Sequence, residues 1–142
     1  MDILKTLNDQ QQAAVTHTEG PVLVFAGAGS GKTRVLTHRI AHLIRDLRIS
    51  PYNILAVTFT NKAAREMKER IEGLLGEGAK GLWVGTFHGT CARILRERGN
   101  SIGIDRNFTI FDDADQMALV RESMDAEDID QKVYKARDIL NL

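Results

Sequence analysis

The residues best suited to chemistry lie in one glycine-rich segment in the first quarter of the chain. It runs Ala26, Gly27, Ala28, Gly29, Ser30, Gly31, Lys32 and Thr33. Glycines let the main chain wrap closely and turn several N–H groups towards an anion. Lys32 supplies a mobile positive charge for phosphate groups, and the Thr33 hydroxyl could ligate Mg²⁺. The segment therefore predicts a site for the phosphates of a nucleotide such as ATP, with Lys32 as the catalytic residue.

One residue departs from the strict phosphate-loop pattern G-x-x-x-x-G-K-[ST], because Ala26 stands in place of the first Gly. The alternative reading is a glycine-rich turn that binds nothing. The segment follows an apolar run, residues 21–25, and precedes a helical pattern, which is the context that a phosphate loop requires. This context favours phosphate binding.

Short apolar runs alternate with helical patterns along the chain, and these elements must position the loop. The runs are residues 21–25, 54–58, 82–86 and 108–111. They are typical of buried parallel strands, and we expect helices after each of them. A last helical pattern carries Ile129, Val133 and Leu140. The alternation predicts an α/β domain with a mostly parallel sheet, whose ligands lie outside the carboxyl ends of the strands.

Composition and charge exclude several classes of protein. The single cysteine, Cys91, excludes an internal disulfide framework. No window approaches the run of about 18 apolar residues that a membrane span needs, and no secretory signal is visible. We therefore expect a cytoplasmic protein without a membrane partner. Residues 1–100 carry 14 Lys and Arg against 9 Asp and Glu, whereas residues 101–142 carry 5 against 10. The basic front could face nucleic acid, although a solvated surface explains the charge equally well.

Four segments in order resemble the motifs of the UvrD/PcrA/Rep helicases of superfamily 1. Residues 7–15 (LNDQQQAAV) look like the Q motif, and residues 26–34 (AGAGSGKTR) look like motif I. Residues 58–64 (TFTNKAA) look like motif Ia, and residues 85–88 (GTFH) look like motif Ib. The resemblance implies a P-loop NTPase (RecA-like) fold, a parallel sheet flanked by helices and truncated at the C-terminal end. It also implies DNA unwinding with 3′-to-5′ polarity, driven by ATP and Mg²⁺.

The resemblance assigns further nucleotide-binding residues. Gln11 would read the edge of the adenine through its amide, which can donate and accept together. Asn8 and Gln11 also have the spacing of a helix capping box, and that reading explains the pair without ATP. Arg34 would lie along the base or the ribose, and otherwise it is a solvated helix charge.

Candidate DNA-binding residues follow the second and third apolar runs. They are Phe59, Thr60, Asn61, Phe87 and His88. An aromatic ring at this edge could stack on a base of single-stranded DNA, which is worth about 1–3 kcal/mol per base. Without the resemblance, the two phenylalanines would be interpreted as core residues. With it, we expect Phe59 and the Phe87–His88 pair to contact DNA, and Thr60 and Asn61 to bind phosphates or to begin the next helix.

Hydrolysis needs an acid that holds Mg²⁺ and a group that orients water. The acidic motif of the family, Asp-Glu followed by Gln-Asp, is absent from the sequence. Asp112 and Asp113 follow residues 108–111 and imitate such a motif, but a helix N-cap is the simpler interpretation. The arginine fingers of the family belong to a second motor domain. We therefore expect these 142 residues alone to have very weak turnover or none.

The sequence thus predicts the front part of a helicase that acts in DNA repair or replication. Residues 1–112 would be the N-terminal part of the ATP-binding domain 1A, and residues 113–142 would begin an inserted helical subdomain, 1B. Partners would be single-stranded and duplex DNA, and the rest of the helicase chain with its domains 1B, 2A and 2B. Two alternatives remain open at this point. One is another P-loop NTPase, such as a GTPase or a small-molecule kinase. The other is a non-catalytic module that binds nucleotide or DNA.

Overall fold

The protein is a mixed helix-and-strand structure of the α/β class. The computed structural model describes residues 3–141. The chain divides into two compact units, Met1–Ile94 and Leu95–Leu142, and the division falls within helix α4 (Phe87–Arg98). Each unit is described separately. None of the helices in the described residues has the length and apolar content needed to cross a bilayer.

The first unit contains a two-stranded parallel sheet. Strand β1 (Leu55–Thr58) pairs with strand β2 (Trp83–Thr86), and Thr58 lies opposite Thr86 at the carboxyl ends. Helix α3 (Asn61–Leu75) connects the two strands and contacts both of them. This helix is the crossover that parallel strands require. The strands predicted at residues 54–58 and 82–86 are confirmed. Because the two strands are parallel and their last residues are paired, the residues that follow β1 and β2 emerge at one edge of the sheet.

The larger core lies between the sheet, α3 and helix α2 (Lys32–Arg45). Its buried side chains are Ile40 from α2, Ala56 from β1, and Met67 and Ile71 from α3. Met67 and Ile71 lie one turn apart on α3, so the predicted apolar face of this helix is the one that packs. The 3₁₀ turn η1 (Pro51–Asn53) precedes β1, and a second 3₁₀ turn, η2 (Gly76–Ala79), lies between α3 and β2.

Helix α1 (Asp9–Thr16) packs against the N-terminal half of α2. Leu7, Val15 and Val35 form a second buried cluster between them. Arg39 on α2 reaches back and donates hydrogen bonds to the carbonyl oxygens of Ala14 (2.8 Å) and His17. A cation at the carboxyl end of a helix satisfies carbonyl groups that have no intrahelical partner. Helix α2 therefore holds both α1 and the sheet core in place.

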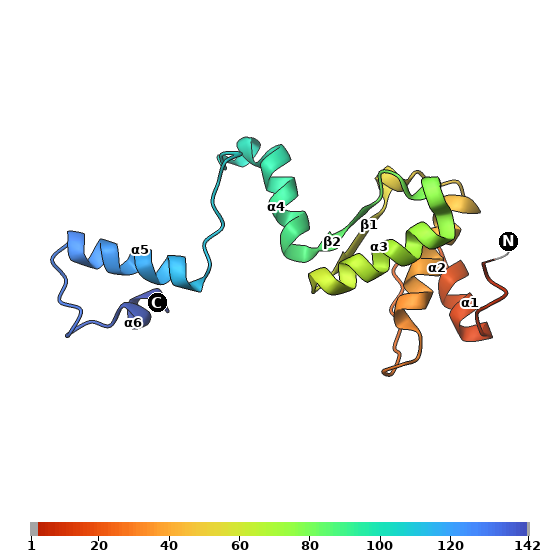
Figure 1. Ribbon diagram of the computed structural model, residues 1–142, viewed down its shortest axis with the longest axis horizontal. Helices are drawn as coiled ribbons and strands as arrows, with labels where there is room; N and C mark the ends of the chain where they lie inside the picture. Colours follow the sequence, from red (N-terminus) through yellow and green to blue (C-terminus); the bar gives the residue numbers. More distant parts are fainter. Residues whose placement is uncertain (1–2, 142) are drawn as a thin grey trace. The chain divides into compact units, whose positions relative to one another are not determined.

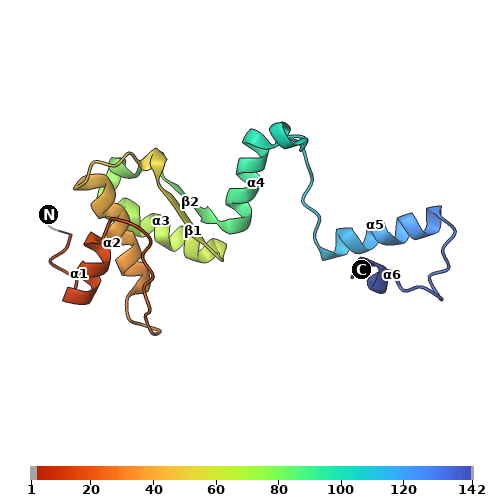
Figure 2. The same ribbon diagram turned by 180° about the vertical axis from the view of Figure 1, so that it is seen from behind.

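The expected first strand, residues 21–25, is not formed. These residues have no regular secondary structure, and Leu23 and Phe25 are 78% and 91% exposed. Figures 1 and 2 show the segment as part of a long loop between α1 and α2 rather than as a third strand beside β1. A strand needs a neighbour that accepts and donates its main-chain hydrogen bonds. The sheet of the described residues has only β1 and β2, and neither of them pairs with this segment.

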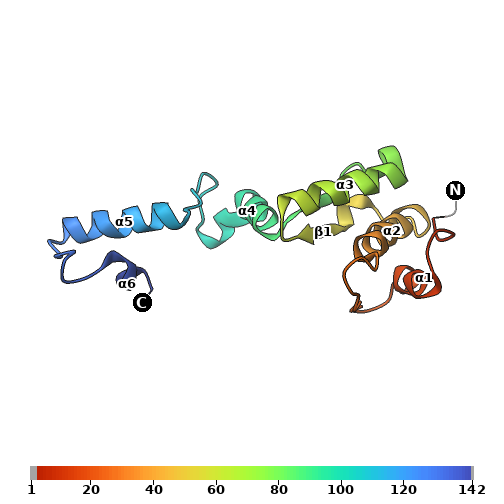
Figure 3. The same cartoon turned by 60° about the horizontal axis from the view of Figure 1, so that its bottom comes forward.

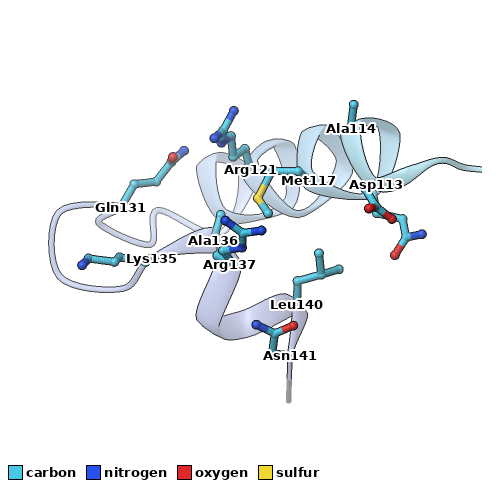
Figure 4. Close-up of a pocket in the computed structure, with 11 residues that line it drawn as sticks. Asp113, Ala114, Met117, Arg121, Gln131, Lys135, Ala136, Arg137, Leu140 and Asn141 are labelled. Atoms are coloured by element: carbon cyan, nitrogen blue, oxygen red, sulfur yellow. The ribbon is translucent and has the colours of Figure 1, made fainter.

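The second unit is helical. It contains the end of α4, the 3₁₀ turn η3 (Gly99–Ile102), helix α5 (Asp113–Ala126) and helix α6 (Ala136–Leu140). Figure 3 shows α6 lying beside α5, and the two helices contact each other. An open groove of about 820 Å³ lies between them, with Arg121, Lys135 and Arg137 among its lining residues (Figure 4).

Two expectations for the second unit are wrong. Residues 108–111 form no strand, since no other strand pairs with them, and the Phe108 ring instead lies 5.2 Å from the guanidinium carbon of Arg96. The last helical pattern is helical only in α6, because residues 127–135 form turns. Asp128 in this stretch has a positive φ of 51°, which a helix interior does not permit.

Candidate functional site

The glycine-rich segment forms an irregular loop that leads directly into α2. Gly29 and Gly31 have φ values of 76° and 87°, and Gly31 is the N-cap residue of the helix. Side chains disfavour this left-handed conformation, so glycine is favoured at both positions. The Gly31 carbonyl accepts the first hydrogen bond of α2 from Val35 N at 2.9 Å. The loop therefore ends with the N-terminal N–H groups of α2, which are suited to an anion.

Lys32 holds the loop in a closed turn. Its Nζ donates to the carbonyl oxygens of Ala26 at 2.9 Å and Gly27 at 2.7 Å. The Ser30 hydroxyl also donates to the Gly27 carbonyl, at 2.7 Å. Lys32 and Ser30 are both exposed to solvent. The ammonium group can therefore exchange these carbonyls for phosphate oxygens without breaking any buried contact.

Gln11 connects α1 to the loop. Its Oε1 accepts a hydrogen bond from Asn8 N at 3.2 Å, and Asn8 Oδ1 accepts one from Gln11 N at 2.9 Å. This is the capping box that the spacing of the two residues predicted. The Gln11 Nε2 donates at the same time to the Ser30 carbonyl, at 3.1 Å. One rotamer of Gln11 therefore caps the helix and contacts the glycine-rich loop.

A cavity of about 430 Å³ lies where α1, the loop and α2 meet. Five of the predicted nucleotide residues line it: Gln11, Ala26, Gly27, Ser30 and Lys32. Asn8, Gln10 and Phe25 are also in the lining. The other predicted nucleotide residues, which do not line it, are Ala28, Gly29, Gly31, Thr33 and Arg34. The fold thus brings together residues that are separated by about 20 positions in the chain.

Thr33 and Arg34 lie on the exposed first turn of α2. The Arg34 carbonyl accepts hydrogen bonds from Thr37 Oγ1 at 3.0 Å and from His38 Nδ1 at 2.9 Å. Thr33 is one hydroxyl ligand of the kind that Mg²⁺ accepts beside phosphate oxygens and water. Within residues 3–141 there is no cluster of three or more His, Cys, Asp or Glu side chains that could hold a metal.

Asp112 caps a helix, as the simpler interpretation of the sequence predicted. Its carboxylate accepts from the main-chain N–H groups of Ala114 and Asp115, both at 2.9 Å. The Asp115 carboxylate accepts in return from Asp112 N at 3.0 Å, so the pair forms a capping box at the start of α5. These bonds give Asp112 a structural role as the N-cap of α5.

Two exposed aromatic side chains meet at the carboxyl edge of the sheet. Phe59 follows β1 and Phe87 follows β2, and their ring centroids lie 5.3 Å apart with an interplanar angle of 44°. Phe59 is 88% exposed and Phe87 is 46% exposed. An apolar pair that folding leaves in water is informative, because such patches mark binding surfaces. The interpretation of these two residues as core is therefore wrong.

Two threonine side chains beside this pair accept hydrogen bonds from main-chain N–H groups at helix N-termini. The Thr60 hydroxyl accepts from Ala63 N at 3.2 Å and caps α3, in which Asn61 is the first residue. Thr86 Oγ1 accepts from Gly89 N at 3.1 Å at the start of α4. His88 is exposed in the first turn of that helix. Thr60, Asn61 and His88 therefore lie next to Phe59 and Phe87 in the chain, at the N-termini of α3 and α4.

Sequence reasoning missed the role of Arg39, which fixes the end of α1 and with it the position of Gln11. A basic residue in the middle of a helix gives no signal of this kind, because its acceptors, the carbonyl groups of Ala14 and His17, lie more than 20 positions earlier in the chain.

The sequence profile of the UvrD/REP helicase N-terminal domain matches residues 7–142. The chain belongs to this family, and the resemblance to the UvrD/PcrA/Rep helicases is confirmed. It is 56% identical over 135 residues to the ATP-dependent DNA helicase PcrA of Staphylococcus epidermidis, and 55% identical to that of Staphylococcus aureus. Each match covers 95% of this chain but 18% of the relative. The chain therefore spans about a fifth of the length of these relatives.

Proposed function

We propose that the chain is the N-terminal part of an ATP-dependent 3′-to-5′ DNA helicase, and that it binds ATP with Mg²⁺ through residues 26–33. The observation that carries this proposal is the cavity in which Gln11, Ser30 and Lys32 come together with the loop. The family and the printed activity of the PcrA relatives support it. The same family membership and the small parallel sheet support a RecA-like P-loop NTPase fold.

The phosphates would lie against the N-terminus of α2. There Lys32 would leave the carbonyl groups of Ala26 and Gly27 and turn its ammonium group to the β- and γ-phosphates, as the catalytic lysine. The main-chain N–H groups of Gly29, Gly31 and Thr33 would donate to the same oxygens. The Thr33 hydroxyl would ligate Mg²⁺, which would neutralise charge on the transferring phosphoryl group.

Adenine recognition is the proposed role of Gln11 and Arg34, the former through its amide edge and the latter along the base or ribose. Residues 1–112 are proposed as the N-terminal part of domain 1A and residues 113–142 as the start of subdomain 1B. Helix α5 begins at Asp113, which supports this boundary, whereas the two compact units divide earlier, between Ile94 and Leu95. A cytoplasmic location and roles in DNA repair or replication belong to the same proposal.

Single-stranded DNA would lie across the carboxyl edge of the sheet. Phe59 and Phe87 would stack on bases, while Thr60, Asn61 and His88 would contact the backbone at the two helix N-termini. Turnover and unwinding would require the acid and the arginine fingers of the remaining chain, with its domains 1B, 2A and 2B. The 142 residues alone are therefore expected to bind nucleotide without unwinding DNA.

A fluorescent ATP analogue titrated into the chain with Mg²⁺ tests the proposal. Lys32→Ala should weaken binding at least about tenfold, because a hydrogen bond to a charged group contributes about 1.5–3 kcal/mol. Lys5→Ala, which removes an exposed lysine away from the loop, is the matched control and should bind like the wild type. Equal affinity of the wild type and Lys32→Ala would reject the proposed site.

A further inference from the structure

The main-chain groups around Gly31 are held from two sides. The Gly31 carbonyl is fixed by Val35 N at 2.9 Å, within α2. The Ser30 carbonyl is fixed by Gln11 Nε2 at 3.1 Å, from α1. Since C=O and N–H point in opposite directions across a trans peptide, the bond from Gln11 also sets the direction of the Gly31 N–H. That N–H is one of the donors that the phosphate loop offers.

Gly31 leaves room for the Gln11 amide because it has no side chain. A Cβ at Gly31 would lie 2.9 Å from Gln11 Nε2, which is closer than real Cβ atoms approach. Gly31 also has a φ of 87°, which favours glycine by itself. The amide of Gln11 therefore packs directly against the last residue before Lys32.

Gln11 is itself held in position. Its Oε1 accepts from Asn8 N in the capping box, and α1 is fixed to α2 by Arg39 and by the buried Val15. A side chain that is restrained at its base and at its oxygen can orient what its nitrogen contacts. The same amide lines the cavity in which Lys32 and Ser30 lie.

We propose that Gln11 is a positioning residue of the phosphate loop, and that it strengthens binding of the triphosphate whatever base is attached. The inference rests on the proposed function of the loop and gives Gln11 a second role, which is distinct from adenine reading. A residue that reads adenine affects adenine nucleotides alone. A residue that orients the Ser30–Gly31 peptide affects ATP, GTP and inorganic tripolyphosphate alike.

Gln11→Glu is the decisive variant. A glutamate keeps the length of the side chain and can still accept from Asn8 N, so the capping box remains. It has no N–H group to donate to the Ser30 carbonyl. We expect the affinity for Mg²⁺–tripolyphosphate, measured by calorimetry on the 142-residue chain, to fall about tenfold, the affinity for GTP to fall by a similar factor, and the affinity for ATP to fall by at least as much.

Two further variants separate the alternatives. Gln10→Glu places the same new charge on a neighbouring residue of the cavity lining, and we expect at most a twofold loss. Asn8→Ala removes the cap acceptor but keeps the Gln11 amide, and we expect a smaller loss than in Gln11→Glu. Circular dichroism and thermal melting check that each variant is folded, and a Gln11→Glu chain that has lost its fold is replaced by Gln11→Met.

The outcomes distinguish this inference from the proposed function. If tripolyphosphate binds the wild type and Gln11→Glu equally while ATP binding falls, Gln11 reads the base only and the inference is overturned. Equal losses in Gln10→Glu and Gln11→Glu, or in Asn8→Ala and Gln11→Glu, would overturn it as well. If neither ATP nor tripolyphosphate binds the wild type more tightly than Lys32→Ala, the proposed function itself fails.

Discussion

Lys32 and Gln11 hold the glycine-rich loop from its two ends. The ammonium group of Lys32 contacts the carbonyls of Ala26 and Gly27, and the amide of Gln11 contacts the carbonyl of Ser30. All of these contacts are exposed hydrogen bonds, so the loop can rearrange at a small cost. The chemistry of the site therefore depends on a few polar side chains rather than on the buried core.

Phe59 provides a prediction for DNA binding at the residue scale. Phe59→Ala should weaken binding of a single-stranded oligonucleotide by roughly fivefold to a hundredfold, since stacking contributes about 1–3 kcal/mol per base. Fluorescence anisotropy at fixed salt measures it. Tyr134→Ala removes another exposed aromatic residue, in the second unit, and should have no effect. Equal affinity of the wild type and Phe59→Ala would remove the sheet edge from the DNA site.

Asp46, the C-cap residue of α2, gives a prediction about pH. The guanidinium of Arg45 and the ring of His42 hydrogen-bond its carboxylate, both at 2.8 Å, and they hold its pKa below the usual 3.8. A lowered pKa in the folded state means that the stabilisation is present above about 3.8 and is lost as the pH falls through the lowered value.

The substitution Asp46→Asn should therefore lower the free energy of unfolding at pH 7 by less than about 1 kcal/mol, because the pair is partly exposed. At the lowest pH at which the chain still folds, the difference from the wild type should shrink. Urea titrations at both pH values measure this change, and a difference that grows towards acid pH would contradict the assignment.

At the scale of elements, helix caps and buried helix faces were predictable from the sequence. Two of the four expected strands are absent from the described residues of the structure. The Asn8–Gln11 and Asp112–Asp115 boxes are local, and residues three positions apart determine them. The spacing on α3 likewise identifies its buried face. Residues 21–25 and 108–111 are as apolar as β1, but strand formation depends on a neighbouring strand that local sequence does not specify.

In the candidate site, too, local features were predictable from the sequence and contacts between elements were not. The sequence predicted the loop, Gln11 and the capping box, because each has a recognisable spacing. It could not predict that the Gln11 amide would reach the Ser30 carbonyl, or that Arg39 would hold the end of α1, since both contacts depend on how α1 packs on α2. It also left open whether Phe59 is buried, which only the position at the sheet edge decides.

Asp112 provides the prediction at the scale of elements. Asp112→Ala should destabilise α5 by about 0.5–2 kcal/mol, whereas Asp112→Asn should keep most of the cap. Neither change should alter the Mg²⁺ dependence of ATP binding. Thermal melting and nucleotide titrations over a range of Mg²⁺ concentrations measure the two effects. A Mg²⁺ requirement that shifts in Asp112→Asn would show that this carboxylate acts at the metal instead.

At the scale of the whole molecule, the segment 21–25 leaves apolar side chains in water directly before the phosphate loop. Leu23 and Phe25 are largely exposed, and the exposed Val22 and Val24 adjoin them in the chain. A contiguous patch of this kind promotes association.

The double change Leu23→Ser and Phe25→Ser should therefore reduce self-association of the 142-residue chain. Light scattering and sedimentation at several concentrations measure it. Ile102→Ser, which alters an apolar residue of similar exposure in the second unit, should have little effect. Self-association that persists unchanged in the double variant would show that another surface is responsible.

The central claim is that residues 26–33 close around the phosphates of ATP, and the most direct measurement is a crystal structure of the chain with Mg²⁺ and a non-hydrolysable ATP analogue. The account predicts phosphate oxygens at the N-terminus of α2, with Lys32 Nζ moved from the Ala26 and Gly27 carbonyls onto them and Thr33 at the metal. Clear density for the nucleotide at another place, with Lys32 still on those carbonyls, would contradict it.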